Sequence, residues 1–389
     1  MLSIPAKISP MYERRAQVML ALAWLALHTV LFSIHGVRHT SDSESYLTYA
    51  AAILDNFHFA ADYRLKYAGY PTFLALLFKI GFGLKGIVVV QTLLSGIATI
   101  YFYKATRLLA GNVFAPLLAT FLLIGWYDLQ MYHAFILTES LYISLLLLAF
   151  YLLVKARTVR QSLWALPLLL VVALVRPNGF IAVVAYLGYL FFGAYTAAPS
   201  PRAKVILVLP VILVPLATLL LVDQYLLQEF DIVQTYAKGE VIFGYKGLLI
   251  SADKQVLMPL ADASPLTKLY LFVHDNPTYF FRMSGWRFFL FWGNVKPYFS
   301  VLHNLVVVVV LYPLYFFTGA AMLKGRIRLP LRAFVAFLLL QQAFITTVTS
   351  EDPIGRFLMS VIAFVFMFGS VGLSWLLLKQ AARKQHAIA

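Results

Sequence analysis

Two acidic residues near the start of the chain stand where a base for group transfer could meet a membrane surface. Asp42 and Glu44 follow shortly after a long apolar stretch, in the segment SDSESYLTYAAAIL. Apolar side chains recur at helical spacing from Tyr46 to Ile53, which predicts an amphipathic helix lying on the membrane with Asp42 near its start. A carboxylate at the membrane surface could accept a proton from a hydroxyl group. The alternative is that Asp42 only stabilises the helix N-terminus.

A second group of polar residues lies in IGWYDLQMYHAFILTESLY, between two apolar stretches. This connection is short, so Asp128 and His133 must stay near the membrane surface. Glu139 falls about one and a half turns into the next apolar stretch, where a carboxylate costs roughly 2–3 kcal/mol to insert. We expect Glu139 to face the protein interior or a water-filled cavity, and a structural hydrogen bond explains it equally well. No second histidine stands at ligand spacing from His133, which argues against a metal ligand there.

Arginine residues at the ends of apolar stretches could bind phosphate. Arg176 lies in LVRPNGF, Arg356 in EDPIGRFLM, and Arg287 in the aromatic segment 279–297. The guanidinium group is suited to bidentate contact with phosphate oxygens. The alternative for each is that the side chain extends to the lipid headgroups. That alternative is strong for Arg287 and weaker for Arg176, which the adjacent Pro177 holds between helices.

The scaffold that carries these residues must be a membrane protein. Hydrophobic residues make up 62% of the chain and charged residues 12%, with a mean hydropathy of +0.83, whereas soluble proteins carry about 25% charged residues. We predict an all-α polytopic bundle of about ten spans. The predicted spans are 17–35, 86–104, 112–127, 134–154, 161–175, 178–194, 203–222, 300–322, 332–350 and 357–378. Segments 70–84 and 279–297 are expected to be interfacial or half-inserted helices.

Charge predicts the orientation of this bundle. With the N-terminus inside, the inner segments collect more than half of the Lys and Arg residues but only one acid, Glu13. This follows the positive-inside rule and places both termini in the cytoplasm. Two large outer loops, 36–85 and 223–299, then carry the polar chemistry. The organisation expected is an N-terminal membrane module (1–222), the second outer loop with its interfacial helix (223–299) and C-terminal membrane helices (300–389).

Several kinds of chemistry are excluded or unsupported. The chain has no cysteine, which rules out disulfides, thiol nucleophiles and cysteine-ligated metals. It contains no Gly-rich phosphate loop, GxSxG elbow or HExxH zinc helix. The net charge of +15 is explained by orientation in the membrane, so no nucleic-acid partner is expected.

The order of these motifs resembles the GT-C superfamily of membrane glycosyltransferases. The resemblance rests on an acidic residue after the first span, the segment GYPTFLALLF, the TESLY start of the fourth span, the LVRP connection and the GRF motif before the last span. It covers about residues 1–195 well and the C-terminal half only through GRF and hydropathy. Members similar in pattern include dolichyl-phosphate-mannose protein mannosyltransferases and the lipid A aminoarabinose transferase. Their acidic pair in the first loop is adjacent, whereas Ser43 separates Asp42 from Glu44 here.

The resemblance implies an inverting transfer of a sugar from a polyprenyl-phosphate donor to a hydroxyl group of a glycan, lipid or protein. It implies that Asp42 is the base, and that Asp128 orients the acceptor or helps to bind a divalent ion, Mg or Mn, if one is used. Arg356, with Arg176 or Arg287, would stabilise the leaving phosphate. We group Glu44, His133 and Glu139 with the substrate-binding residues. The expected location is a bacterial inner membrane, with the site on the periplasmic face.

Two other functions stay open at this point. An O-antigen polymerase or ligase also has about ten spans and a large outer loop, but relies on outer Arg and His residues rather than an early acid. A transporter or lipid flippase would show repeat symmetry and paired polar residues at mid-membrane depth. The sequence has His28, Gln91 and Gln341 with Gln342 within apolar stretches but no visible repeat, which ranks the transporter third.

Overall fold

The protein is helical in every part that the structure describes, apart from connecting segments and isolated bridges. The computed structural model describes residues 10–60, 63–200, 232–252, 255–260 and 262–388. Seven of the described helices are long and apolar enough to cross a membrane. They are α1 (Pro10–His35), α4 (Leu84–Ala110), α7 (Thr138–Lys155), α10 (Phe180–Ala197), α15 (Val301–Leu323), α16 (Leu329–Val348) and α18 (Ile362–Ile388).

The predicted all-α bundle is confirmed, while the described residues show fewer full spans than the ten predicted. Predicted span 112–127 ends at a bend of 60° between α5 (Phe114–Gly125) and the segment Tyr127–Ala134, and this pair would make an eighth span. The bend arises at Trp126, whose backbone is extended. Predicted span 161–175 is part of a shorter apolar helix, Val159–Val175. Predicted span 203–222 lies outside the described residues.

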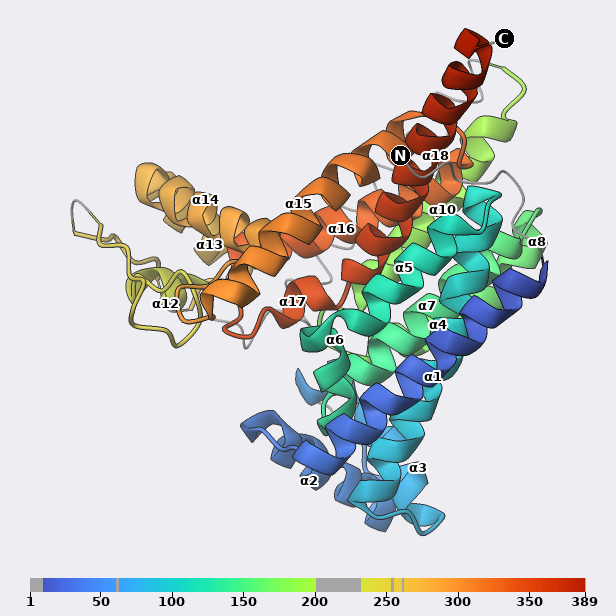
Figure 1. Ribbon diagram of the computed structural model, residues 1–389. Helices are drawn as coiled ribbons and strands as arrows, with labels where there is room; N and C mark the ends of the chain where they lie inside the picture. Colours follow the sequence, from blue (N-terminus) through green and yellow to red (C-terminus); the bar gives the residue numbers. More distant parts are fainter. Residues whose placement is uncertain (1–9, 61–62, 201–231, 253–254, 261, 389) are drawn as a thin grey trace.

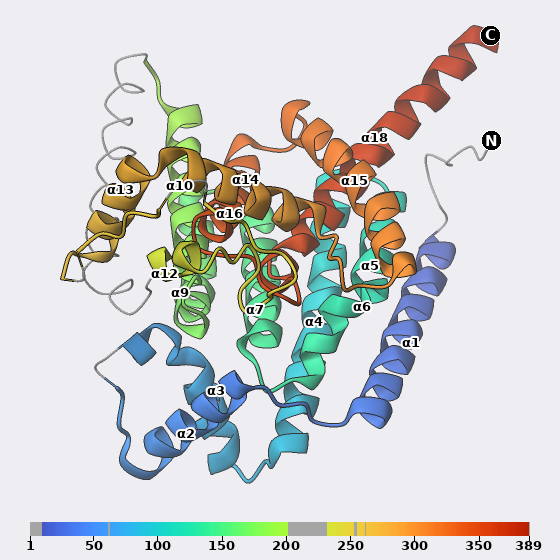
Figure 2. The ribbon, with the colours of Figure 1, turned by 90° about the vertical axis from the view of Figure 1, so that its left-hand side faces the viewer.

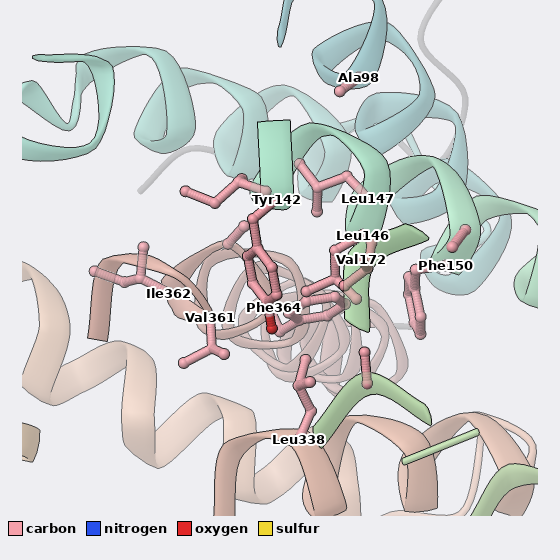
Figure 3. Close-up of a cluster of buried hydrophobic side chains, with 14 of the residues drawn as sticks. Ala98, Tyr142, Leu146, Leu147, Phe150, Val172, Leu338, Val361, Ile362 and Phe364 are labelled. Atoms are coloured by element: carbon pink, nitrogen blue, oxygen red, sulfur yellow. The ribbon is translucent and has the colours of Figure 1, made fainter. Parts of the chain in front are cut away.

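A continuous apolar core joins the long helices. Figure 3 shows Tyr142, Leu146 and Phe150 of α7 meeting Leu338 of α16 and Phe364 of α18. Because these side chains interdigitate between helices, they fix the relative positions of the helix ends that carry the polar residues.

The contact between α15 and α18 depends on two glycines of α18. A Cβ added at Gly372 would lie 2.0 Å from the carbonyl oxygen of Phe317, and one at Gly369 would lie 2.8 Å from the Leu314 side chain. Only glycine allows the two backbones to approach this closely. The close approach therefore holds the first part of α18, which follows Arg356 in the chain, against α15.

Short helices cover one end of the bundle. In Figure 1, α2 (Ser41–Asn56) and α3 (Gly69–Lys79) lie below the long helices, and α12 (Ile232–Ala237), α13 (Pro265–Asp275) and α14 (Pro277–Gly293) project to the left. The first turn of α1 and the last turn of α18 lie away from these short helices (Figures 1 and 2). We call the end with the short helices the outer end. The predicted interfacial segments 70–84 and 279–297 correspond to the separate short helices α3 and α14.

Three connections that are distant in sequence meet at the outer end. The turn before α17 (Arg356–Met359) pairs with the second outer loop, because the Phe243 amide donates to the Glu351 carbonyl at 2.9 Å and the Glu351 amide donates to Val241 at 3.2 Å. The same turn contacts the first outer loop through a side chain of α2. The outer end is therefore one connected assembly.

Candidate active site

Asp42 is placed by the first turn of α2. The helix starts where the Thr40 amide donates to Ser43 Oγ at 2.9 Å, a bond that fixes the first turn. The buried face of α2, which includes Tyr46, Tyr49 and Ile53, packs against α3. This burial leaves Asp42 on the exposed side of the helix start, with 42% of its side chain accessible.

Arg356 joins three carboxylates at the outer end. Its Nη1 lies 2.9 Å from Asp42 Oδ2 and 4.0 Å from Glu139 Oε1, and its Nε lies 2.9 Å from Asp352 Oδ2. Arg176 Nη2 lies 3.4 Å from the same Glu139 oxygen. We call these five residues the outer charge cluster. The structure thus brings together four predicted site residues, Asp42, Glu139, Arg176 and Arg356, and adds Asp352.

The outer charge cluster is buried on one side and partly exposed on the other, and we call the exposed side its mouth. The side chains of Glu139 and Arg176 are 1% and 4% exposed, whereas those of Arg356 and Asp42 are 29% and 42% exposed. Glu139 faces the protein interior as predicted, where it pairs with Arg176 and accepts a hydrogen bond from the Thr138 hydroxyl. A substrate arriving at the mouth would meet Asp42 and Arg356 first.

The turn before α17 is shaped to present Arg356. Asp352 Oδ1 accepts the amide protons of Ile354 at 2.9 Å and Arg356 at 3.3 Å. Gly355 has a φ of +68°, a conformation that favours glycine. Burial alone would lower the pKa of Arg356, but the carboxylates of Glu139, Asp352 and Asp42 outweigh burial and raise it. The guanidinium therefore stays charged in the site.

Two tyrosines line the buried side of the outer charge cluster. Burial raises the pKa of Tyr46 and Tyr70, and the carboxylate of Glu139 raises both further. Their rings lie edge to face with centroids 5.4 Å apart. Both phenols therefore stay neutral and can donate a hydrogen bond rather than serve as a base.

Asp128 lies in a different contact from Asp42. It sits in the first turn of α6 (Tyr127–Met131), and its Oδ2 lies 3.3 Å from His303 Nε2 at the start of α15. Both side chains are partly exposed, at 22% and 27%. The pairing with His303 was not predicted, since nothing in the sequence connects residues so far apart. That Asp128 orients an acceptor stays a prediction.

His133 and Glu44 also lie apart from the contacts of Arg356. His133 is buried, with its Nδ1 2.7 Å from Ser140 Oγ and its ring centroid 5.4 Å from that of His28. These contacts give it a structural role between helices. Glu44 is exposed on α2, two positions from Asp42. Substrate binding by either residue stays a prediction.

Arg287, predicted to bind phosphate with extension to the lipid headgroups as the strong alternative, is not one of the outer charge cluster and does not extend to the headgroups. It is fully buried, and it donates to the Val348 carbonyl at 3.3 Å, to Thr235 Oγ1 at 3.0 Å and to the Glu240 carbonyl at 2.7 Å. Its guanidinium also lies 4.2 Å from the Tyr236 ring centroid. Buried charges are tolerated when hydrogen-bonded in this way. Arg287 therefore joins α14 to α12 and to the end of α16.

A divalent metal ion finds little support in the geometry. Among the described residues, no group of three or more His, Cys, Asp or Glu side chains converges as a metal site. Asp128, the predicted ligand, pairs with His303 and not with a second carboxylate. Use of Mg or Mn stays a prediction.

No family model matches the chain, and no curated protein is significantly similar to it.

Proposed function

We propose that this protein is a membrane glycosyltransferase that moves a sugar from a polyprenyl-phosphate donor to an acceptor hydroxyl at the outer end of the bundle. The observation that carries the proposal is the pairing of Asp42 with Arg356 at 2.9 Å. A candidate base and a candidate phosphate-binding cation, 314 positions apart in sequence, meet in a partly exposed site. The order of motifs that resembles the GT-C superfamily supports the same assignment.

The reaction needs a base on one side of the sugar and positive charge on the other. The acceptor oxygen attacks the anomeric carbon, the bond from that carbon to the phosphate oxygen breaks, and the polyprenyl phosphate leaves with the electron pair. Asp42 takes the proton of the acceptor hydroxyl. Attack opposite the leaving group inverts the anomeric carbon.

Arg356 has to exchange partners for this reaction to proceed. Its guanidinium is bound by carboxylates, and a phosphate group offers the same bidentate geometry with more negative charge. When phosphate takes over Nη1 of Arg356, the Asp42 carboxylate is released to accept a proton. The arrangement therefore couples donor binding to activation of the base.

The buried pair of Glu139 and Arg176 lies next to Arg356 and helps to position it. Glu139 contacts both arginines, so it holds their positive charges close together at the end of the apolar core. A buried carboxylate between two guanidinium groups is stable only while both stay in place. We assign these two residues to positioning Arg356 and not to proton transfer.

The polar residues within the apolar stretches give the transporter alternative no particular support. The Gln91 amide donates to the carbonyls of His133 at 2.8 Å and Phe135 at 2.6 Å, and Asn178 donates to Gln342 Oε1 at 2.6 Å. These bonds join neighbouring elements within the bundle. Such side chains are explained by helix packing.

A transfer assay tests the proposal. Purified protein in liposomes is incubated with radiolabelled polyprenyl-phosphate sugars and a mixture of glycan, lipid and peptide acceptors. Because general-base catalysis contributes about 10²–10⁴-fold, Asp42→Asn should lower transfer by that factor while donor binding persists. The matched control is Asp55→Asn, which removes an exposed carboxylate from the last turn of the same helix. No transfer by the wild type with any donor, or full transfer by Asp42→Asn, contradicts the proposal.

A further inference from the structure

A fully buried ion pair adjoins the outer charge cluster. Lys296 Nζ is 3.0 Å from Glu351 Oε1, and the two side chains are 0% and 1% exposed. Glu351 is the residue next to Asp352, which binds Arg356. Replacing a buried ion pair with apolar side chains is often neutral or stabilising, so stability alone is a weak reason for a protein to keep one. The location of this pair suggests another role.

The backbone is fixed on both sides of the ion pair. The Lys296 amide donates to Asn304 Oδ1 at 3.2 Å, and Asn304 Nδ2 donates to the Lys296 carbonyl at 2.9 Å. On the other side, the amide and carbonyl of Glu351 are bound by Val241 and Phe243 of the second outer loop. The backbone positions from which the two side chains extend are therefore both held by hydrogen bonds.

Two further contacts hold the turn formed by residues 351–355 against residues 294–298, the segment that includes Lys296. The Tyr298 hydroxyl donates to the Pro353 carbonyl at 2.5 Å. A Cβ added at Gly355 would lie 2.8 Å from Asn294 Oδ1, so the turn presses against this side chain. Residues 294–298 thus lie along residues 351–355, immediately before Arg356.

We propose that the Lys296–Glu351 pair is a positioning device that ties residues 294–298 to the 351–355 turn and so aims the Arg356 guanidinium at Asp42 and Glu139. The other ionisable groups that face this pair are Asp352 in the same turn and the Tyr298 phenol. Neither Lys296 nor Glu351 touches the substrate in this scheme. The effect of the pair on sugar transfer rests on the proposed function, whereas its effect on the geometry of the turn does not.

The geometric part can be tested without any substrate. The chain has no cysteine, so spin labels can be attached to Thr48→Cys on α2 and Ile354→Cys in the turn, both exposed positions. We expect a narrow distance distribution between the two labels in the otherwise unchanged protein. Lys296→Met and Glu351→Gln should each broaden or shift it. The matched control Lys246→Met removes an exposed lysine of the second outer loop and should leave the distribution unchanged.

The double variant Lys296→Met with Glu351→Gln separates positioning from mere charge compensation. It leaves no unpaired buried charge, so its thermal stability should exceed that of Lys296→Met. If the pair positions the turn, the label distances stay broadened or shifted in the double variant. A narrow, wild-type distribution in the double variant, or in both single variants, overturns the proposal.

The functional part is measured by donor titration. Lys296→Met should raise the half-saturating concentration of polyprenyl-phosphate sugar by about tenfold or more, with a smaller change in turnover, since the cation that binds phosphate is misplaced. If label distances change but titration is unaffected, the pair has no positioning role in transfer and the proposal is overturned. If the wild type transfers no sugar at all, the proposed function fails, and the label distances still decide whether the pair positions the turn.

Discussion

At the scale of single residues, the outer charge cluster combines groups that the sequence could nominate with groups that it could not. Asp42 and Arg356 were predicted because each lies at the end of an apolar stretch, where charge needs an explanation. Asp352 was not singled out, although its spacing of four residues from Arg356 is a usable signal. The pairing of Asp128 with His303 has no local signal, because it depends on how α6 and α15 pack.

Arg356 should be needed for use of the donor. A charge-assisted hydrogen bond contributes roughly 1.5–3 kcal/mol, so Arg356→Ala is expected to weaken donor use by one to two orders of magnitude. Arg356→Lys keeps the charge but loses the bidentate geometry, and should recover only part of the activity. A donor titration with Lys246→Ala as the control for lost charge measures this. Unchanged turnover and half-saturation in Arg356→Ala would show that Arg356 does not bind the phosphate.

Glu351 should make the stability of the protein depend on pH. Burial, assisted by Asp352 and opposed by Lys296, raises the pKa of Glu351 to about 7 from an ordinary value of 4.5. A raised pKa in the folded state means that the contribution of Glu351 to the free energy of unfolding is full below pH 4.5. It is lost as pH rises through 7, by an amount on the order of 3 kcal/mol.

Thermal unfolding of purified protein from pH 4.5 to pH 8 measures this contribution. The wild type should lose stability relative to Glu351→Gln as pH rises, because glutamine stays neutral throughout. Asp55→Asn, which removes an exposed carboxylate, should retain the pH dependence of the wild type. Parallel curves for the wild type and Glu351→Gln would mean that Glu351 does not titrate in this range.

At the scale of elements, periodicity and hydropathy predicted most of the helices. The features that the sequence did not predict arise from how the helices pack. The amphipathic pattern from Tyr46 to Ile53 predicted α2 and its buried face correctly. The 60° bend after α5 was not predicted, because the sequence indicates a connection near Asp128 but carries no signal of the direction that the chain takes there. Arg287 was predicted to bind phosphate, with extension to the headgroups as the strong alternative, because nothing in its own segment shows that Thr235 of α12, the Glu240 carbonyl and the end of α16 accept hydrogen bonds from its guanidinium.

The crossing of α15 and α18 should be sensitive to a single methyl group. Gly372→Ala places a Cβ where the Phe317 carbonyl oxygen already lies, and overpacking of this kind costs about 1–3 kcal/mol. Gly319→Ala on α15 is the matched control, since nothing lies within 4 Å of its added Cβ. Gly319→Ala should be neutral or stabilising through its helix propensity. Equal melting temperatures for the two variants would contradict the close approach.

At the scale of the whole molecule, charge distribution predicted which segments would share one end. The acids fall almost entirely in the outer segments, and the structure joins four of these segments through Asp42, Glu139, Asp352 and Glu351. Which acid meets which base could not be predicted, because residues such as Asp42 and Arg356 are brought together only by the packing of the entire bundle. The sequence thus predicted that acidic segments gather at one end of the molecule, but not the contacts between them.

The orientation of the molecule in the membrane can be tested with the same cysteine-free background. The charge asymmetry predicts that the end of α18 is cytoplasmic and that the second outer loop is outside. In intact cells, a membrane-impermeant maleimide should therefore label Lys246→Cys, and should label Lys379→Cys only after the membrane is permeabilised. Both positions are exposed in the structure, so accessibility on the protein surface does not limit labelling. Because the outer charge cluster lies at the same end as the second outer loop, labelling of Lys379→Cys alone in intact cells would move the site to the cytoplasmic face. A donor and an acceptor would then have to be available on that side.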